Sequence, residues 1–160
     1  VAEALANEGA RVLCADLDAE KAERLANRVR GRTCSPDEIL FADVDIVAPC
    51  ASGGVITEDA ARRLRAFAVC GAANNILASP EAALALVERG ILHVPDPIAS
   101  AGAVIEGIGQ LVMNLPDRTP LIDRLGETAR EVLAEARRTG RTPSDVAEAR
   151  ALRIVGAGKS

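Results

Sequence analysis

The sequence predicts an α/β fold built on a doubly wound parallel sheet. Short apolar runs of strand length alternate with amphipathic helical segments as far as Pro97. Glycine or proline stands at most of the junctions between them. Strands that alternate with helices in this way form parallel sheets with helices on both faces. Beyond Pro97 the pattern becomes helical only, which predicts a C-terminal group of helices.

Four strands are expected, each short and apolar. They cover residues 11–16, 45–50, 66–70 and 91–94. The first of them ends in an acid, Asp16. The last contains the single histidine, His93, which we expect to be a strand residue without a chemical role.

Capping residues mark the expected helices. Asp18 and Thr57 can each accept a hydrogen bond from the first turn that follows, and Ser79 precedes a proline at the first helical position. Gly31 and Gly90 end two of the helices. The helical segments expected are residues 1–8, 18–31, one that begins at 57, 79–90, 99–113, 121–139 and a last one from 142.

Length and charge exclude several classes of protein. The 160 residues are enough for one domain with its own core, and no apolar run reaches the length of a membrane span. The 19 basic residues are outnumbered by 23 acidic ones, so no basic footprint for nucleic acid is evident. Trp and Tyr are absent, which removes the stacking platform of single-strand binders. We therefore expect neither a nucleic-acid partner nor a membrane, and a cytoplasmic location.

Cysteine and histidine usage argues against metal and nucleophilic sites. The four cysteines form no CxxC pair, and zinc needs three or four such ligands close together. Free, buried thiols are the preferred interpretation, although an even count leaves disulfides open. With one histidine and no paired base, Cys–His or Ser–His–Asp catalysis is not indicated.

Asp16 is the first candidate for a binding role. In a dinucleotide-binding βαβ unit, an acid about 20 residues beyond a glycine fingerprint accepts hydrogen bonds from the ribose. Only 15 residues precede Asp16, so the glycine fingerprint would lie upstream of Val1. The pattern that begins at Val1 is typical of the middle of a helix. The fold expected is therefore Rossmann-like and lacks its first strand. An ordinary turn aspartate is the alternative, and this argument alone does not separate the two.

Three loops of small and polar residues follow successive expected strands. They cover residues 49–54, 71–75 and 96–102. The middle one contains two adjacent amides, Asn74 and Asn75, which can donate and accept hydrogen bonds. Loops at the carboxyl ends of parallel strands meet at one edge of the sheet, where such folds bind ligands. Each loop alone is more often a plain turn, but together they indicate a binding site.

These blocks resemble the cofactor-binding half of the glutamate/leucine/phenylalanine/valine dehydrogenase family. Their order and spacing match that family from Val1 to Ile105, and the second and third blocks are more specific for its leucine/phenylalanine/valine branch. The residues that carry the resemblance are Cys14-Ala-Asp16, Ala48-Pro-Cys-Ala-Ser-Gly-Gly-Val-Ile56, Cys70-Gly-Ala-Ala-Asn-Asn75, Arg89-Gly-Ile-Leu-His-Val-Pro-Asp96 and Ser100-Ala-Gly102.

The resemblance implies an activity and a set of contacts. Members of the family deaminate an L-amino acid oxidatively to a 2-oxo acid and pass hydride to NAD. The acid Asp16 would hold the adenosine ribose, and the other implied roles fall on the strand-end loops. By resemblance, Cys50 and Ala51 would line the adenine side, Ala73 and Asn74 would contact the nicotinamide and its ribose, Asn75 would support the loop, and Ser100 would bind substrate.

The chain departs from the family in two places. Ser100 stands where an asparagine is usual, and Pro97 replaces an aromatic or aliphatic residue. Neither Lys21 nor Lys159 is placed to act as the catalytic base, so no catalytic residue is assigned. We expect a truncated NAD-binding domain over residues 1–115, a helical extension over 116–160, and no turnover by this fragment alone.

Two alternatives to an enzyme fragment stay open. The first is a non-catalytic remnant or regulatory module that retains the fold, and the second is an oligomerisation module that uses the long apolar helix after Pro97. For the complete enzyme, the expected partners are an L-amino acid and further copies of the same chain.

Overall fold

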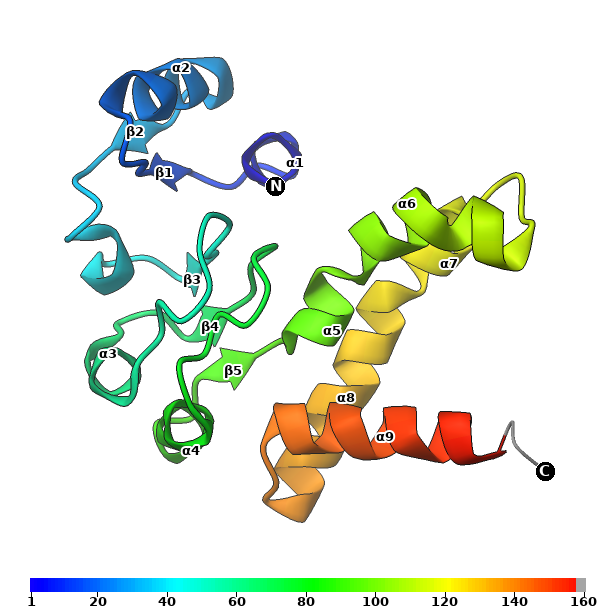
Figure 1. Ribbon diagram of the computed structural model, residues 1–160. Helices are drawn as coiled ribbons and strands as arrows, with labels where there is room; N and C mark the ends of the chain where they lie inside the picture. The colour runs from blue at the N-terminus through cyan, green and yellow to red at the C-terminus, as the bar shows by residue number, and fades with distance from the viewer. Residues whose placement is uncertain (158–160) are drawn as a thin grey trace.

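The computed structural model describes residues 1–157, apart from the side chains of residues 110 and 113. Helices alternate with short parallel strands up to β5, and helices alone follow (Figure 1). In chain order the elements are α1 Ala2–Asn7, β1 Leu13–Cys14, α2 Ala19–Val29, β2 Arg32–Thr33, the 3-10 turn η1 Ile39–Phe41, β3 Ile46–Val47, α3 Glu58–Arg63, β4 Ala68–Val69, α4 Pro80–Glu88, β5 Leu92–His93, α5 Asp96–Ala99, α6 Ala101–Met113, α7 Thr119–Asp123, α8 Leu125–Thr139 and α9 Pro143–Ala157.

All strand pairs are parallel, which confirms the predicted α/β class. Figure 1 shows α1 on the opposite side of the strands from α3 and α4, the arrangement of a doubly wound sheet. The strands form two separate hydrogen-bonded sheets, a two-stranded sheet of β1 and β2 and a three-stranded sheet in the order β3–β4–β5. In the larger sheet Val47 is paired with Val69, and Val69 with His93.

The strands are shorter than predicted, and one was missed. Each has two residues in the ladder, because prolines that lack an N–H follow β3 and β5 closely, at Pro49 and Pro95. The missed strand, β2, has two exposed residues and so carries no apolar signal. The backbone holds it, since Arg32 N donates to Val12 O at 3.0 Å.

The main core lies between the three-stranded sheet and helices α3 and α4. Val47 and Val69 project from the strands into it, while Leu64 and Leu86 close it from the helix side. Full burial of a leucine of this size contributes about 1.5–3 kcal/mol. Ile46, adjacent to Val47 and thus on the opposite face of β3, is 46% exposed.

Two of the three predicted caps are present, and Thr142, at the predicted start of the last helix, is a cap as well. Asp18, Thr57 and Thr142 each accept a hydrogen bond from a first-turn N–H, at 3.1–3.2 Å. Ser79 makes no side-chain cap hydrogen bond. Pro80, at the first helical position, is the residue that favours the start of α4. The left-handed residue that ends α2 is Arg30 rather than Gly31.

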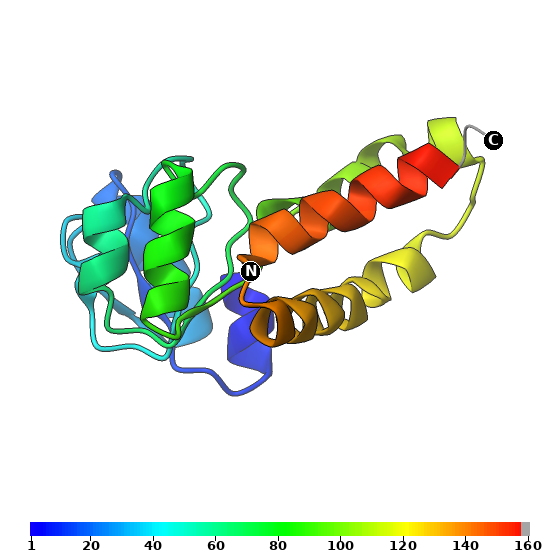
Figure 2. The ribbon, with the colours of Figure 1, turned by 90° about the horizontal axis from the view of Figure 1, so that it is seen from below.

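The C-terminal helices form a second cluster beside the sheet, and Figure 2 shows them extending away from it. The helix predicted over residues 121–139 is broken at Arg124 between α7 and α8, and α5 is a short helix where we predicted a loop over residues 96–102. Ile98 of α5 packs with Val132 and Val146 of the last two helices. The end of the strand region and the helical extension therefore share this core.

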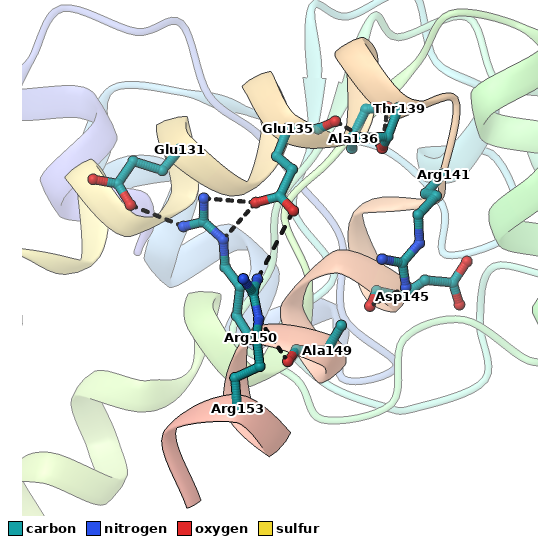
Figure 3. Close-up of polar contacts among 9 residues, drawn as sticks. All are labelled: Glu131, Glu135, Ala136, Thr139, Arg141, Asp145, Ala149, Arg150 and Arg153. Carbon is teal, nitrogen blue, oxygen red and sulfur yellow. Dashed lines mark hydrogen bonds and ion pairs between the residues drawn. The ribbon is translucent and has the colours of Figure 1, made fainter. Parts of the chain in front are cut away.

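An ion-pair network ties α8 to α9 (Figure 3). Arg150 contacts Glu131 and Glu135, each at 2.8 Å, and Arg153 lies 3.9 Å from Glu135. The hydrogen bond from Arg150 is the main cause of the lowered pKa of Glu135. Among residues 1–157, none of the helices combines the length and apolar character that crossing a membrane requires.

Candidate functional site

The loops that follow β3 and β4 are hydrogen-bonded to each other. Gly54 N donates to Asn75 O at 2.7 Å, and Ala73 N donates to Pro49 O at 3.1 Å. Beyond them, Ile56 and Leu77 form an isolated parallel bridge. The two loops therefore form one unit at the carboxyl edge of the sheet.

Small residues permit this close approach. A side chain on Gly71 would collide with Pro49 O, and one on Gly53 would come within 2.7 Å of Asn74 O. Contacts with backbone atoms cannot be relieved by turning a side chain. These two glycines therefore keep the loops together for a steric reason.

The loop after β4 is also fixed to α5, the element that follows β5. Asp96 Oδ2 accepts a hydrogen bond from Ile76 N at 3.0 Å. Ser100 Oγ, at the end of α5, lies 2.7 Å from Asp96 O and 3.1 Å from the Asn74 side-chain amide. The structure thus brings the three loops together.

A pocket of about 400 Å³ opens at this junction. Its polar lining comes from the asparagine loop and α5, and its apolar lining from the start of α6. The lining residues are Asn74, Asn75, Asp96, Pro97, Ser100, Ala101, Val104 and Ile105. Amide and hydroxyl groups beside an apolar wall fit a flat ligand that carries hydrogen-bonding substituents.

Cys50 and Ala51 lie next to this pocket in chain order but are not among the residues that line it. Both are exposed in the loop after β3. Ala73 is 8% exposed and contributes its N–H to the contact between loops. Burial raises the pKa of the Cys70 thiol at the end of β4, and the neighbouring Cys50 adds to the increase.

Asp16 sits apart, after β1 in the two-stranded sheet. Its Oδ1 accepts a hydrogen bond from Asp18 N at 2.9 Å, which is the turn geometry considered as the alternative. The carboxylate is exposed. Among the hydrogen bonds of residues 1–157, none links Asp16 to the three loops, so its binding role stays a prediction.

The sequence interpretation missed a buried pair behind the pocket. His93 is 3% exposed, and its Nε2 lies 3.9 Å from Asp96 Oδ1. In the described part of the chain, neither ring nitrogen nor that carboxylate oxygen has a hydrogen-bond partner. Burial lowers the pKa of His93 to about 4, against a smaller opposing effect of Asp96. The sequence signal for this pair was that His93 and Asp96 stand three residues apart, on the two sides of a strand end.

Basic and metal-binding groups do not gather at the site. Lys21 is exposed on α2 and lies 3.8 Å from Asp18, while Lys159 is outside the described residues. Within residues 1–157 no three His, Cys, Asp or Glu side chains are close enough to hold a metal ion. The cysteines in this part are all free, as expected, but the expectation that they are buried holds for Cys14 and not for the other three.

Parallel strands with converging loops at their carboxyl ends define an α/β domain of the kind that binds ligands at this edge of its sheet. Comparison with known proteins identifies the family. The model of the Glutamate/Leucine/Phenylalanine/Valine dehydrogenase family matches residues 8–117, and the chain belongs to that family.

The relatives are amino-acid dehydrogenases. The leucine dehydrogenase of Thermoactinomyces intermedius is 36% identical over 108 residues, which cover 68% of this chain and 30% of the relative. The valine dehydrogenase of Streptomyces coelicolor is 34% identical over 150 residues, which cover 91% of this chain and 41% of the relative. The chain therefore spans less than half of either protein.

A solved structure supports the fold directly. The L-tryptophan dehydrogenase of Nostoc punctiforme superimposes with a TM-score of 0.84 at 28% sequence identity. The match covers 92% of this chain and 45% of that one. The family and its leucine/phenylalanine/valine branch, both expected from the sequence, are confirmed.

Proposed function

We propose that this chain is the NAD-binding portion of an amino-acid dehydrogenase. The complete protein would deaminate a branched-chain or aromatic L-amino acid to the 2-oxo acid. The observation that carries the proposal is the junction of three strand-end loops, fixed by Asp96 and Ser100, in a chain of this family. NAD, when bound, supplies the hydride acceptor.

The residues at the junction fit a nicotinamide group. Asn74 and Asn75 offer amide groups that can pair with a carboxamide, and Val104 and Ile105 offer an apolar wall. Ala73 would contribute backbone, and Ser100 would lie at the substrate end. Cys50 and Ala51 would form the adenine side with their backbone. We place the domain boundary at residues 115–116.

Asp16 is the residue proposed to hold the adenosine ribose. An exposed carboxylate can accept hydrogen bonds from ribose hydroxyls and repels a 2′-phosphate, which favours NAD over NADP. The fragment alone is proposed to be inactive, because no residue in it is assigned the role of catalytic base.

The test uses the natural protein that contains this chain. We expect NADH to form when branched-chain or aromatic L-amino acids are supplied, and calorimetric titration to detect NAD binding. Asp16→Ala should weaken NAD binding by about tenfold or more, as loss of a hydrogen bond to a charged group does. Asp37→Ala removes an exposed turn acid of equal charge and should have no effect. Absence of turnover on every amino acid would reject the proposal.

We also propose that the complete protein is a homo-oligomer. Several large apolar side chains of α6 and α9 are more than half exposed, and such a surface indicates a protein contact. They are Ile108, Leu111, Val112, Leu152, Ile154 and Val155. The mass of the natural protein in solution, measured by light scattering, tests this, and a monomer at micromolar concentration would reject it.

A further inference from the structure

The Ser100 hydroxyl lies between the backbone carbonyl of Asp96 and the side-chain amide of Asn74. Asp96 O is 2.7 Å from Ser100 Oγ, and the Asn74 amide is 3.1 Å away. A serine hydroxyl has one proton and can donate fully to only one of them. The other contact must therefore be of a different kind.

The distances decide which group receives the proton. The value of 2.7 Å is the usual length of an O–H···O bond, whereas 3.1 Å is long for one and ordinary for an N–H···O bond. If the proton pointed at Asn74, two oxygens without a proton between them would face each other at 2.7 Å. Ser100 therefore donates to Asp96 O, at the C-terminal end of α5.

The side-chain orientation of Asn74 follows from this. With its proton committed, Ser100 Oγ presents only lone pairs, and these accept a hydrogen bond from an amide NH2. The oxygen and nitrogen of an asparagine amide are assigned from the hydrogen-bond network rather than from shape. Asn74 accordingly turns its NH2 toward Ser100 and its carbonyl oxygen toward the pocket.

We propose that Ser100 is a positioning residue which makes Asn74 a hydrogen-bond acceptor for the carboxamide NH2 of the bound dinucleotide. The inference rests on the proposed function, and it changes how Ser100 acts: through Asn74, with no free proton left to donate to substrate. Asp96 supports the same arrangement, because its carboxylate holds Ile76 N next to the asparagines.

The test compares two reduced dinucleotides on the natural protein. One is NADH, and the other is its analogue in which an acetyl group replaces the carboxamide. The analogue keeps the ring carbonyl but lacks the NH2 donor. We expect NADH to bind more tightly than the analogue by about two- to tenfold, the range that one neutral hydrogen bond gives. An Asn74 that presented its NH2 to the pocket would bind the two alike.

Variants of Ser100 separate positioning from general stability. Ser100→Ala frees the Asn74 amide, so the affinity ratio should fall toward one, with the loss mainly on NADH. Ser100→Thr keeps the hydroxyl and should keep the ratio. Thr139→Ala is the matched control, because Thr139 Oγ1 also donates to a carbonyl four residues earlier, at 2.8 Å, but on α8 (Figure 3). It should leave the ratio unchanged.

The outcomes of these binding measurements distinguish failure of the positioning role from failure of the proposed function. A ratio in Ser100→Ala equal to that of the unaltered protein would overturn the positioning role, as would equal loss of affinity for both dinucleotides. Failure of the unaltered protein to bind NADH at all would instead reject the proposed function, and the positioning role with it. Circular dichroism of each variant shows that it is folded.

Discussion

Removing the ionisable ring of His93 is expected to abolish a pH dependence of stability. In the native chain burial holds the pKa of His93 near 4, whereas the ordinary value of 6.5 applies after unfolding. Between these values the unfolded chain binds a proton that the native chain does not. Stability is therefore complete above pH 6.5 and decreases as the pH falls toward 4.

The size of the effect follows from the two pKa values. Lowering the pH from 7 to 5 almost fully protonates the unfolded imidazole and leaves the native one largely neutral. The linkage relation then gives a loss of about 2 kcal/mol in the free energy of unfolding. We choose this window because most carboxylates are ionised throughout it.

Urea unfolding at pH 7 and pH 5 measures this loss. The chain has neither Trp nor Tyr, so far-UV circular dichroism is the suitable signal. The comparison is with His93→Leu, an apolar side chain in a position where neither ring nitrogen has a partner. Its stability should change far less between the two pH values. Equal pH dependence in both proteins would show that His93 is not buried in its neutral form.

Three further changes probe packing and charge. Leu86→Ala, at a fully buried position, should lower the free energy of unfolding by about 2–5 kcal/mol in urea titrations. Gly71→Ala should abolish dinucleotide binding measured by calorimetry, because the added methyl would collide with Pro49 O and separate the loops. Arg150→Met should lower the melting temperature, and less so in 1 M salt (~3 Å screening length), since its ion pairs with α8 are partly exposed.

Helix starts could be predicted because the signal is local. Asp18 and Thr57 cap the helices that follow them, as expected from their type and position. The break at Arg124 could not be predicted, because arginine does not disfavour a helix by itself. Its cause lies in tertiary packing, since α7 packs against α6 and α8 packs against α5.

Strand extent was less predictable, since it depends on partners rather than on sequence. The exposed pair Arg32 and Thr33 becomes a strand only because Val12 and Cys14 offer backbone groups beside it. Conversely, each predicted strand has ladder partners over two residues, at 13–14, 46–47, 68–69 and 92–93, and the rest of its predicted span lies outside the paired ladder. Hydrophobic pattern therefore located the four apolar strands but not their ends, and it missed β2.

The candidate site was predictable as loops but not as a network. Small residues after each strand indicated where the backbone could be approached, and Gly53 and Gly71 have steric reasons to be small. The role of Asp96 was not visible, because its partner Ile76 is 20 residues away in the sequence. Small residues in a loop indicate that a ligand can approach its backbone, whereas the tertiary contacts decide which atoms face the ligand.

The same contacts explain why the site depends on both its glycines and its acid. Gly53 and Gly71 allow the loops after β3 and β4 to touch. Neither glycine holds a loop against α5. Asp96 provides that connection through a single carboxylate oxygen, with its other oxygen facing His93. Loss of the acid should therefore loosen the asparagine loop while leaving the paired loops together, whereas a larger residue in place of Gly71 should separate the loops themselves.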